Sequence, residues 1–346
     1  MGRNRRRKKK KRYGLWVGIS LLSGVLILIG VGAAALYAKL DKIDFQPSEN
    51  MEVSINPEVK LEGYTNLALF GVDSRESDLE HSNSDAIIII SIAHDEKKIK
   101  MVSVYRDTFL DVGDNDYRKC NAAYMQGGPE QAISMLNRNL DLNISDYIAV
   151  DFNIVAEMVD LVDGITLTLT EEEVGYVNDY CVETSEVTGK TYEPILPETE
   201  GEFHLNGVQA VSYARIRYTA GNDFKRTERQ RQVIQLVSEK IKNSSPTELY
   251  KMADKILPMI KTSFDKKELL SMGVAMMTYS IDESTGFPFE LEGKDIPEIG
   301  SCVVATSLSS NVKELHELLF QNQNYQVSAQ VDEISYGIDK LLSGGL

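Results

Sequence analysis

The chain has 346 residues, which is enough for one large domain or two modest ones. Hydrophobic residues make up 42% and charged residues 26%, an ordinary globular composition that excludes disorder of the whole chain. The formal net charge is −15, from 37 Lys and Arg against 52 Asp and Glu. Nine of the cations stand in residues 1–12, so 28 cations face 52 acids in the rest of the chain. Such an acidic body argues against a nucleic-acid partner.

The spacing of cysteines and histidines excludes several kinds of site. Cys120, Cys181 and Cys302 lie far apart without CxxC or Cys/His spacing, which excludes a zinc ribbon and allows at most one disulfide. The four histidines are scattered, and the chain has no GxSxG, Walker or GxGxxG motif. These absences argue against a nucleophilic triad and against a nucleotide cofactor.

An apolar segment follows the basic N-terminal tail, residues 1–14. Residues 15–38 carry no charge over 24 positions, which is enough for a helix to cross the ~30 Å hydrocarbon core of a bilayer. The cations before this segment predict a single-pass membrane protein with a cytoplasmic tail near anionic membrane lipid and with residues 39–346 outside the cell. A cleaved signal peptide is the alternative: the segment exceeds the ~7–15 residues of a signal core, but alanines near its end permit cleavage.

The order of elements after this segment is that of a mixed α/β protein. Residues 39–61 are polar, which predicts a stalk. Nearly continuous apolar strands are expected at 66–72, 86–93 and 100–105. Apolar runs without alternation are typical of strands buried on both faces, so we expect a sheet that is covered on both sides.

The rest of the body contains further helical and extended patterns. Helices are expected at 129–140, 153–163, 206–213, 226–242, 246–260, 266–278 and 311–320, and short strands at 147–151, 165–169 and 302–305. Residues 170–203 are acidic and irregular, which favours a surface insertion. Residues after 321 carry only weak signals.

Ionisable residues stand at the ends of the first three expected strands. Asp73 follows the first strand, Asp85 begins the second, and Arg106 follows the third. Strand ends of this kind can meet at one edge of a sheet, where α/β proteins bind ligands. Two carboxylates there suit Mg²⁺, which proteins hold with one or two carboxylates plus substrate phosphates. The alternative is that both are ordinary acids of turns.

A second cluster is cationic. Five arginines stand between positions 215 and 231 of an otherwise acidic body: Arg215, Arg217, Arg226, Arg229 and Arg231. Arg215 and Arg217 share one face if their segment is extended. Arg226 and Gln230 are four residues apart on a helix, on the face that carries its apolar residues, so Arg226 is drawn inward and needs an anionic partner. A surface helix with salt bridges to Glu228 and Glu239 is the alternative.

Two carboxylates, several guanidinium groups and a metal ion together suit phosphoryl transfer. In such reactions, positioning and charge neutralisation supply most of the catalysis. Guanidinium groups bind phosphate through paired hydrogen bonds and stay charged at physiological pH.

The motifs also resemble those of a known family. The order NLALFGVDSRE, SDAIIIISI, IKMVSVYRDT, KCNAAYMQGG, YARIRY and DFKRTERQRQVI, behind a basic tail and one apolar segment, resembles the LytR–CpsA–Psr family of Gram-positive cell-envelope enzymes. The resemblance covers about residues 62–325, the expected catalytic domain, and leaves residues 326–346 as a C-terminal tail. It implies one extracytoplasmic α/β domain with a central mixed sheet flanked by helices and an apolar pocket for a lipid chain.

The resemblance implies a phosphotransferase. Such an enzyme moves an anionic glycopolymer, teichoic-acid-like or capsular, from polyprenyl pyrophosphate to the C6 hydroxyl of N-acetylmuramic acid in peptidoglycan, with Mg²⁺ as cofactor. Two alternatives stay open: a membrane-anchored pyrophosphatase that uses water as acceptor, and a non-enzymatic regulator or attenuator of the cell envelope.

The resemblance also implies roles for individual residues. The Mg²⁺ acids fall on Asp73 and Asp85, and Asp107 is a candidate base or a supporting residue beside the catalytic Arg106. The residues that bind the pyrophosphate are Arg75, Arg106, Arg215, Arg217, Arg226 and Gln230. Family members often have Gly where Lys225 stands, a departure that alters the loop but keeps Arg226.

Overall fold

The computed structural model describes residues 44–45, 51–72, 83–218, 222–265, 268–269, 272–273 and 277–344. The expected basic tail and the apolar segment at 15–38 lie outside these ranges. Among the helices inside them, none is long and apolar enough to cross a membrane.

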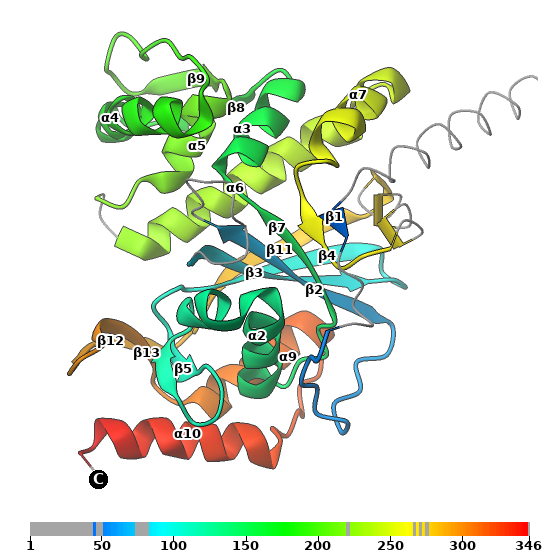
Figure 1. Cartoon of the computed structure of the whole chain (residues 1–346), viewed down its shortest axis with the longest axis vertical. Coiled ribbons are helices and arrows are strands. Elements are labelled where there is room, and N and C mark those ends of the chain that lie inside the picture. Colours follow the sequence, from blue (N-terminus) through cyan, green and yellow to red (C-terminus); the bar gives the residue numbers. More distant parts are fainter. Residues whose placement is uncertain are drawn as a thin grey trace, which may run out of the picture.

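A mixed β-sheet forms the centre of the molecule (Figure 1). Within the described residues it has seven strands, in the order β1 (Asp44–Phe45), β10 (Lys261–Thr262), β7 (Asp146–Val150), β2 (Tyr64–Val72), β3 (Ser84–Ala93), β4 (Lys98–Val104) and β11 (Ser280–Phe287). The central β2, β3 and β4 are antiparallel, whereas β7 pairs with β2 and β11 pairs with β4 in parallel. The expected central mixed sheet flanked by helices is therefore confirmed.

Both faces of the central strands are buried, as the apolar runs predict. Phe70 and Ile89 belong to a core cluster on one face, and Leu67 and Ile92 belong to a different cluster on the other. Successive side chains of a strand point to opposite faces, so a strand with apolar residues at nearly every position needs a cover on each side.

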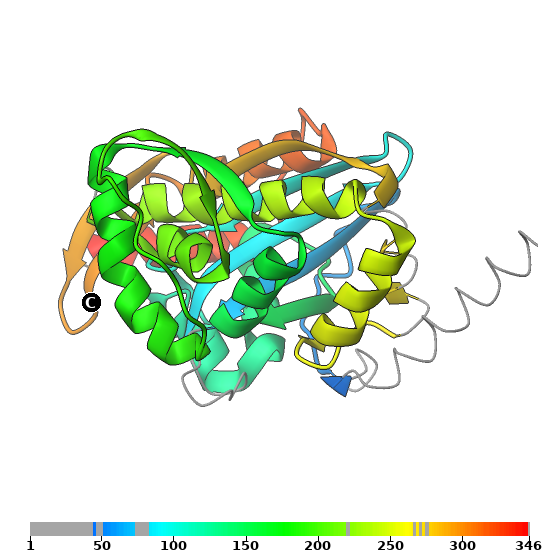
Figure 2. The same ribbon diagram turned by 90° about the horizontal axis from the view of Figure 1, so that it is seen from above.

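The helices lie in two layers, one on each side of the sheet (Figures 1 and 2). The lower layer in Figure 1 consists of α2 (Ala122–Leu140), α9 (Leu308–Phe320) and α10 (Ala329–Leu342). The upper layer contains α3 (Phe152–Leu161), α4 (Glu171–Thr188), α5 (Gly207–Arg215), α6 (Asn222–Lys242) and α7 (Pro246–Ile256). Among the described residues, three two-stranded sheets accompany these helices (Figure 1). In the upper layer β8 (Ile165–Leu169) pairs with β9 (Gly201–Leu205). On the lower side β5 (Phe109–Asp111) pairs with β6 (Tyr117–Lys119), and β12 (Leu291–Ile296) pairs with β13 (Gly300–Ala305).

The acidic segment 170–203 is irregular only at 189–200, so the expectation was wrong for its first part, where α4 forms, and for its last residues, which begin β9. Helix α4 begins with a capping box, in which Thr170 and Glu173 each accept a hydrogen bond from the backbone of the other. Its buried side chains recur at helical spacing: Val174, Val177, Cys181 and Thr184. The many carboxylates on the outer face hid this narrow inner face in the sequence.

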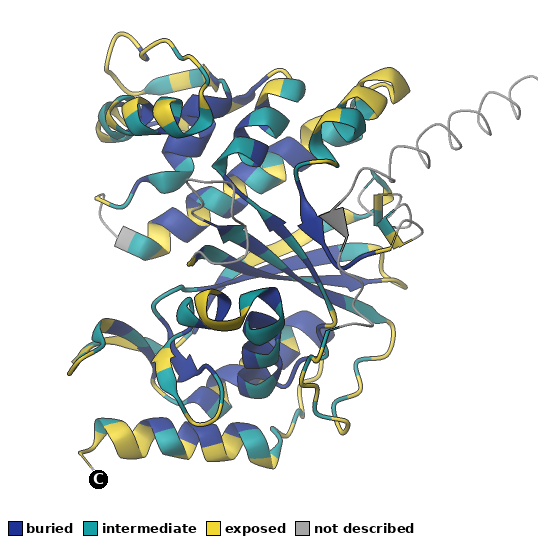
Figure 3. Ribbon diagram, viewed as in Figure 1, coloured by how far each residue is buried: buried dark blue, intermediate teal, exposed yellow. Residues whose placement is uncertain are grey.

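The folded body extends beyond both expected boundaries of the catalytic domain. Residues 326–346, expected as a tail, contain α10, whose Val331, Ile334 and Ile338 pack into the core (Figure 3). The described part of the expected stalk is docked too, because Met51 packs against the same core and the Ser54 backbone N–H donates to Ser134 Oγ at 3.0 Å.

Smaller differences concern caps and cysteines. Helix α3 is capped by Asp151, whose side chain accepts from the Ile154 N–H, so it begins one residue before the expected start at 153. All three cysteines are buried and free, so the disulfide that the sequence allowed does not form in this structure.

Candidate phosphate-binding site

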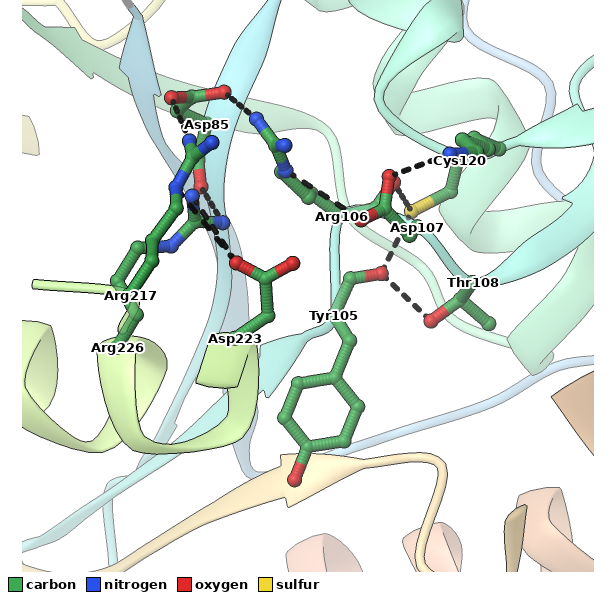
Figure 4. Close-up of polar contacts among 10 residues, drawn as sticks. Asp85, Tyr105, Arg106, Asp107, Thr108, Cys120, Arg217, Asp223 and Arg226 are labelled. Carbon is green, nitrogen blue, oxygen red and sulfur yellow. Dashed lines mark hydrogen bonds and ion pairs between the residues drawn. The ribbon is translucent and has the colours of Figure 1, made fainter. Parts of the chain in front are cut away.

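The site lies at one edge of the central sheet. Ser84, at the start of β3, pairs with Val72 at the end of β2, and Ile87 pairs with Val104 at the end of β4. The antiparallel pairing therefore brings Asp85 and Arg106 to the same edge. Arg106 Nη1 lies 2.6 Å from Asp85 Oδ1 (Figure 4).

Two further arginines reach Asp85 from distant parts of the chain. Arg217 follows α5, and its Nη2 lies 3.1 Å from Asp85 Oδ2. Arg226 lies in the first turns of α6, and its Nη2 lies 3.4 Å from the backbone carbonyl oxygen of Asp85. Three guanidinium groups thus surround Asp85 (Figure 4).

Arg226 is the most deeply buried of these cations, with 2% of the residue exposed. Burial, together with repulsion from Arg217 and Arg106, lowers the pKa of Arg226 to about 10, although Asp223 opposes the shift. Among the described residues, its Nε and Nη1 atoms have no hydrogen-bond partner, and Asp223 Oδ1 lies 3.3 Å from Nη1 as an ion pair. A buried cation with unused donors is a suitable partner for an incoming anion.

The ion pairs continue on the other side of Arg106. Its Nε lies 3.6 Å from Asp107 Oδ2, and Lys119 Nζ lies 3.3 Å from Asp107 Oδ1. Burial disfavours the charge of Arg106, but attraction to Asp85, Asp107 and Asp223 outweighs it and raises the pKa of the guanidinium group. The network alternates cations and carboxylates and has an excess of one cation: Lys119, Asp107, Arg106, Asp85, Arg217, Asp223 and Arg226.

A buried thiol holds the turn that carries Arg106. Cys120 Sγ lies 3.2 Å from the Tyr105 carbonyl oxygen and 3.3 Å from that of Arg106. Burial raises the pKa of the Cys120 thiol, which therefore stays protonated and donates to these carbonyls. The Tyr105 ring also contacts Phe224 edge-on, with centroids 4.6 Å apart, and so anchors the start of α6 beside the strand end.

Arg215 does not join this network. It is the last residue of α5, so the expected extended segment shared with Arg217 is wrong. Its Nη2 lies 2.8 Å from Glu183 Oε2, its Nη1 lies 2.9 Å from Thr184 Oγ1, and its guanidinium carbon lies 4.8 Å from the centroid of the Phe152 ring.

Gln230 lies one turn after Arg226 on α6, as expected. Its Oε1 is buried and has no hydrogen-bond partner among the described residues. Asp73 and Arg75 lie outside the described residues. Within those residues, no three His, Cys, Asp or Glu side chains are grouped as a metal site would require. The single carboxylate of Asp85 is of the type that Mg²⁺ accepts when phosphate oxygens supply the remaining ligands.

The sequence analysis missed residues that position the arginines. Asp223 contacts both Arg217 and Arg226, and its signal was the spacing of three residues before Arg226 on one helix. Arg229 was seen only as part of a basic cluster. Its Nη1 donates to the Ile216 carbonyl oxygen at 3.2 Å, and its Nη2 contacts Glu173 Oε1 at 2.9 Å, which ties the loop before Arg217 to α4.

A separate pocket of about 490 Å³ lies beside the start of α3. Its lining includes Asp151, Glu157, Lys190 and Lys261, and none of the expected site residues. These charged walls do not suit a polyprenyl chain.

Comparison with known proteins agrees with the fold and the motifs. The model of the LytR_cpsA_psr family matches residues 32–315. The Enterococcus faecalis protein named polyisoprenyl-teichoic acid–peptidoglycan teichoic acid transferase TagU is 29% identical over 298 residues, which cover 83% of this chain and 91% of TagU. The Staphylococcus aureus regulatory protein MsrR is 27% identical over 223 residues, 64% of this chain and 62% of MsrR.

Solved structures share the fold. The LytR-CPS2A-psr family protein YwtF (TagT) with bound octaprenyl pyrophosphate lipid superimposes with a TM-score of 0.57 and 17% identity, over 82% of this chain and 100% of that one. Because the family model covers most of the sequence, including each strand end that carries the charged network, the chain belongs to the LytR_cpsA_psr family.

Proposed function

We propose that this protein is a phosphotransferase that moves an anionic glycopolymer from polyprenyl pyrophosphate to peptidoglycan. The observation that carries the proposal is the convergence of Arg106, Arg217 and Arg226 on Asp85 at the sheet edge. The names of TagU and of the lipid-bound TagT support the same class of donor and acceptor.

The charge of the network suits a diphosphate. Four cations face three carboxylates, and Arg226 keeps donors that have no hydrogen-bond partner among the described residues. A diphosphate would supply anionic oxygens for these unused donors of Arg226. Planar guanidinium groups can each bind two such oxygens. Arg217 and Arg226 would hold the diphosphate, and Arg106 would neutralise charge that develops during transfer.

The transfer itself exchanges one oxygen for another at phosphorus. The C6 hydroxyl of N-acetylmuramic acid attacks the phosphorus that bears the polymer, its proton is released to a base, and the bond to the leaving polyprenyl phosphate breaks. Both Asp107 oxygens contact cations, which favours a role in orienting Arg106 over a role as the base.

Mg²⁺ belongs to the proposal as a cofactor. Asp85 would hold it together with Asp73, because Val72 and Ser84, which precede these two acids, are paired in the sheet. When bound, the ion would neutralise phosphate charge. We further propose that residues 15–38 anchor the chain in the cell membrane, with the folded body outside, close to the lipid carrier.

A transfer assay tests the proposal. The full chain is incubated with Mg²⁺, a polyprenyl-pyrophosphate-linked polymer and peptidoglycan oligomers, and acceptor-linked and released polymer are measured separately. We expect linked polymer from the wild type and a loss of at least ~100-fold for Arg217→Ala, since one lost charge-stabilising donor typically costs that much. Arg118→Ala is the matched control, because Arg118 is 55% exposed and pairs only with Asp116 within the described residues.

The assay also separates the alternatives. Released polymer without linked product would identify a pyrophosphatase. The name of MsrR favours a regulator as the second candidate, and full cellular function of the Arg217→Ala variant would support it over the transferase.

A further inference from the structure

An exposed aromatic ring follows an arginine of the site. Tyr218 follows Arg217 in the chain and is 71% exposed. The Tyr176 hydroxyl, from α4, donates to the Tyr218 carbonyl oxygen at 3.2 Å, and the two rings lie 6.2 Å apart at 37°. The backbone of Tyr218 is thus held while its ring stays open to solvent.

A third tyrosine, Tyr180, lies one turn further along α4. The guanidinium carbon of Arg215 lies 5.4 Å from the centre of its ring. Burial raises the pKa of the Tyr180 hydroxyl, Tyr218 adds to the rise, and the charges of Arg215 and Arg217 oppose it. The tyrosines therefore lie on the side of Arg217 that faces Arg215 and α4, with Tyr218 next to Arg217 in the chain.

The Tyr218 ring contributes little to the packing of the folded core. Tyr176 and Tyr180 pack one side against the core of the upper layer, whereas most of Tyr218 contacts water. Exposed aromatic rings grouped with polar side chains are typical of binding surfaces, because a ring covers apolar area and its hydroxyl still forms hydrogen bonds.

The surrounding charge selects among ligands. Asp179 is exposed on the same stretch of α4, and Glu183, which pairs with Arg215, lies one turn beyond it. Carboxylates repel phosphate groups but accept hydrogen bonds from sugar hydroxyls. The apolar C–H face of a pyranose ring matches an aromatic ring, so an uncharged sugar fits this surface better than an anionic unit of the polymer.

We propose that Tyr176, Tyr180 and Tyr218 form a platform that binds the first uncharged sugar of the lipid-linked donor. The proposal rests on the proposed function. The donor sugar is favoured over the acceptor because it is bonded to the diphosphate itself, and Tyr218 directly follows Arg217, which would hold that diphosphate.

Binding of two probes tests the platform: polyprenyl pyrophosphate without sugar, and the same lipid with one N-acetylhexosamine. We expect Tyr218→Ala to weaken binding of the sugar-bearing lipid about five- to tenfold, in line with aromatic contacts, and to leave binding of the bare lipid unchanged. Tyr218→Trp should restore binding. Tyr336→Ala on α10 is the matched control, because Tyr336 is 70% exposed but belongs to the opposite layer.

Each other outcome overturns the platform. Equal weakening of both probes would mean that Tyr218 acts through Arg217, and a raised KM for peptidoglycan alone would assign the rings to the acceptor. If both probes bind the Tyr218→Ala variant as tightly as the wild type, the platform is excluded but the proposed function is not contradicted. If the wild type binds neither probe, both the platform and the proposed function are contradicted.

Discussion

Two carboxylates, the partly exposed Asp85 and the buried Asp141, show how differently this fold uses the same chemical group. Asp141 follows α2 in the lower layer and is fully buried. It accepts hydrogen bonds from the Ser328 N–H at 2.7 Å, the Ser328 hydroxyl at 2.6 Å and the Tyr325 hydroxyl at 3.1 Å. These donors are neutral and bind both oxygens, and they fasten the start of α10 to the end of α2.

Asp85 lies among cations instead. Arg106 and Arg217 contact its two oxygens, and Arg226 contacts its carbonyl group while Arg226 Nε has no hydrogen-bond partner among the described residues. A saturated cluster of neutral donors stabilises the fold, whereas a cluster with surplus charge and unused donors costs stability and is ready for a ligand. We therefore expect mutations around Asp85 to change ligand binding and mutations around Asp141 to change the free energy of unfolding.

The largest effect is expected from Arg226→Met. Diphosphate binding should fall at least ~100-fold, because the buried cation is lost, while the melting temperature should stay at or above that of the wild type, because a costly buried charge is removed. Binding of polyprenyl pyrophosphate and thermal unfolding measure the two effects.

Arg231→Met is the control for Arg226→Met. Arg231 is also buried on α6, and burial lowers its pKa, but among the described residues it has no ion pair with the network around Asp85. The Arg231→Met variant should bind polyprenyl pyrophosphate as tightly as the wild type. A clear fall in melting temperature for Arg226→Met alone would show that the network around Asp85 stabilises the fold. It would contradict the proposed difference between the Asp85 and Asp141 clusters.

An intermediate effect is expected from Asp141→Ala. The variant leaves three partly buried donors without their acceptor and places alanine at a φ of 51°, so the free energy of unfolding should fall by about 3 kcal/mol. Transfer activity of the folded protein should not change. Asp141→Asn, which tolerates this backbone conformation, should lose less. Chemical denaturation measures the loss, and a drop in activity at full folding would contradict the assignment.

The smallest effect concerns pH. His316 is buried, stacks on Tyr325 at 3.6 Å, and its Nε2 lies 3.0 Å from the Leu140 carbonyl oxygen. Burial lowers the pKa of His316 below its usual 6.5, so the unfolded chain takes up a proton before the folded one does. Stability should therefore decline as pH falls below about 6.5, by at most ~1.4 kcal/mol per pH unit from this group.

Denaturation at pH 7.5, 6.5 and 5.5 tests this expectation. The His316→Gln variant should be less stable at pH 7.5 but should show a flatter dependence on pH than the wild type. Equal slopes for the two proteins would exclude His316 as a source of acid sensitivity.

The sequence predicted the central strands within two residues, because apolar runs such as that of β3 leave few alternatives. It also placed the cap of α5 at Asn206. It failed for α4 and α10, where acidic or sparse patterns hid the residues that pack inward. In the site, strand ends correctly located Asp85 and Arg106, and the apolar face of α6 correctly predicted that Arg226 is buried.

The sequence by itself determined the family, the strand ends that carry charge and the arginines available to bind an anion, because these are local patterns of residue type. Only the tertiary structure decided which guanidinium group meets which carboxylate. Arg217 contacts Asp85 across 132 positions, whereas Arg215, two residues earlier, faces Glu183. The reason is that α5 ends between the two arginines, and the packing of α4, α5 and α6 against one another directs their side chains to different partners.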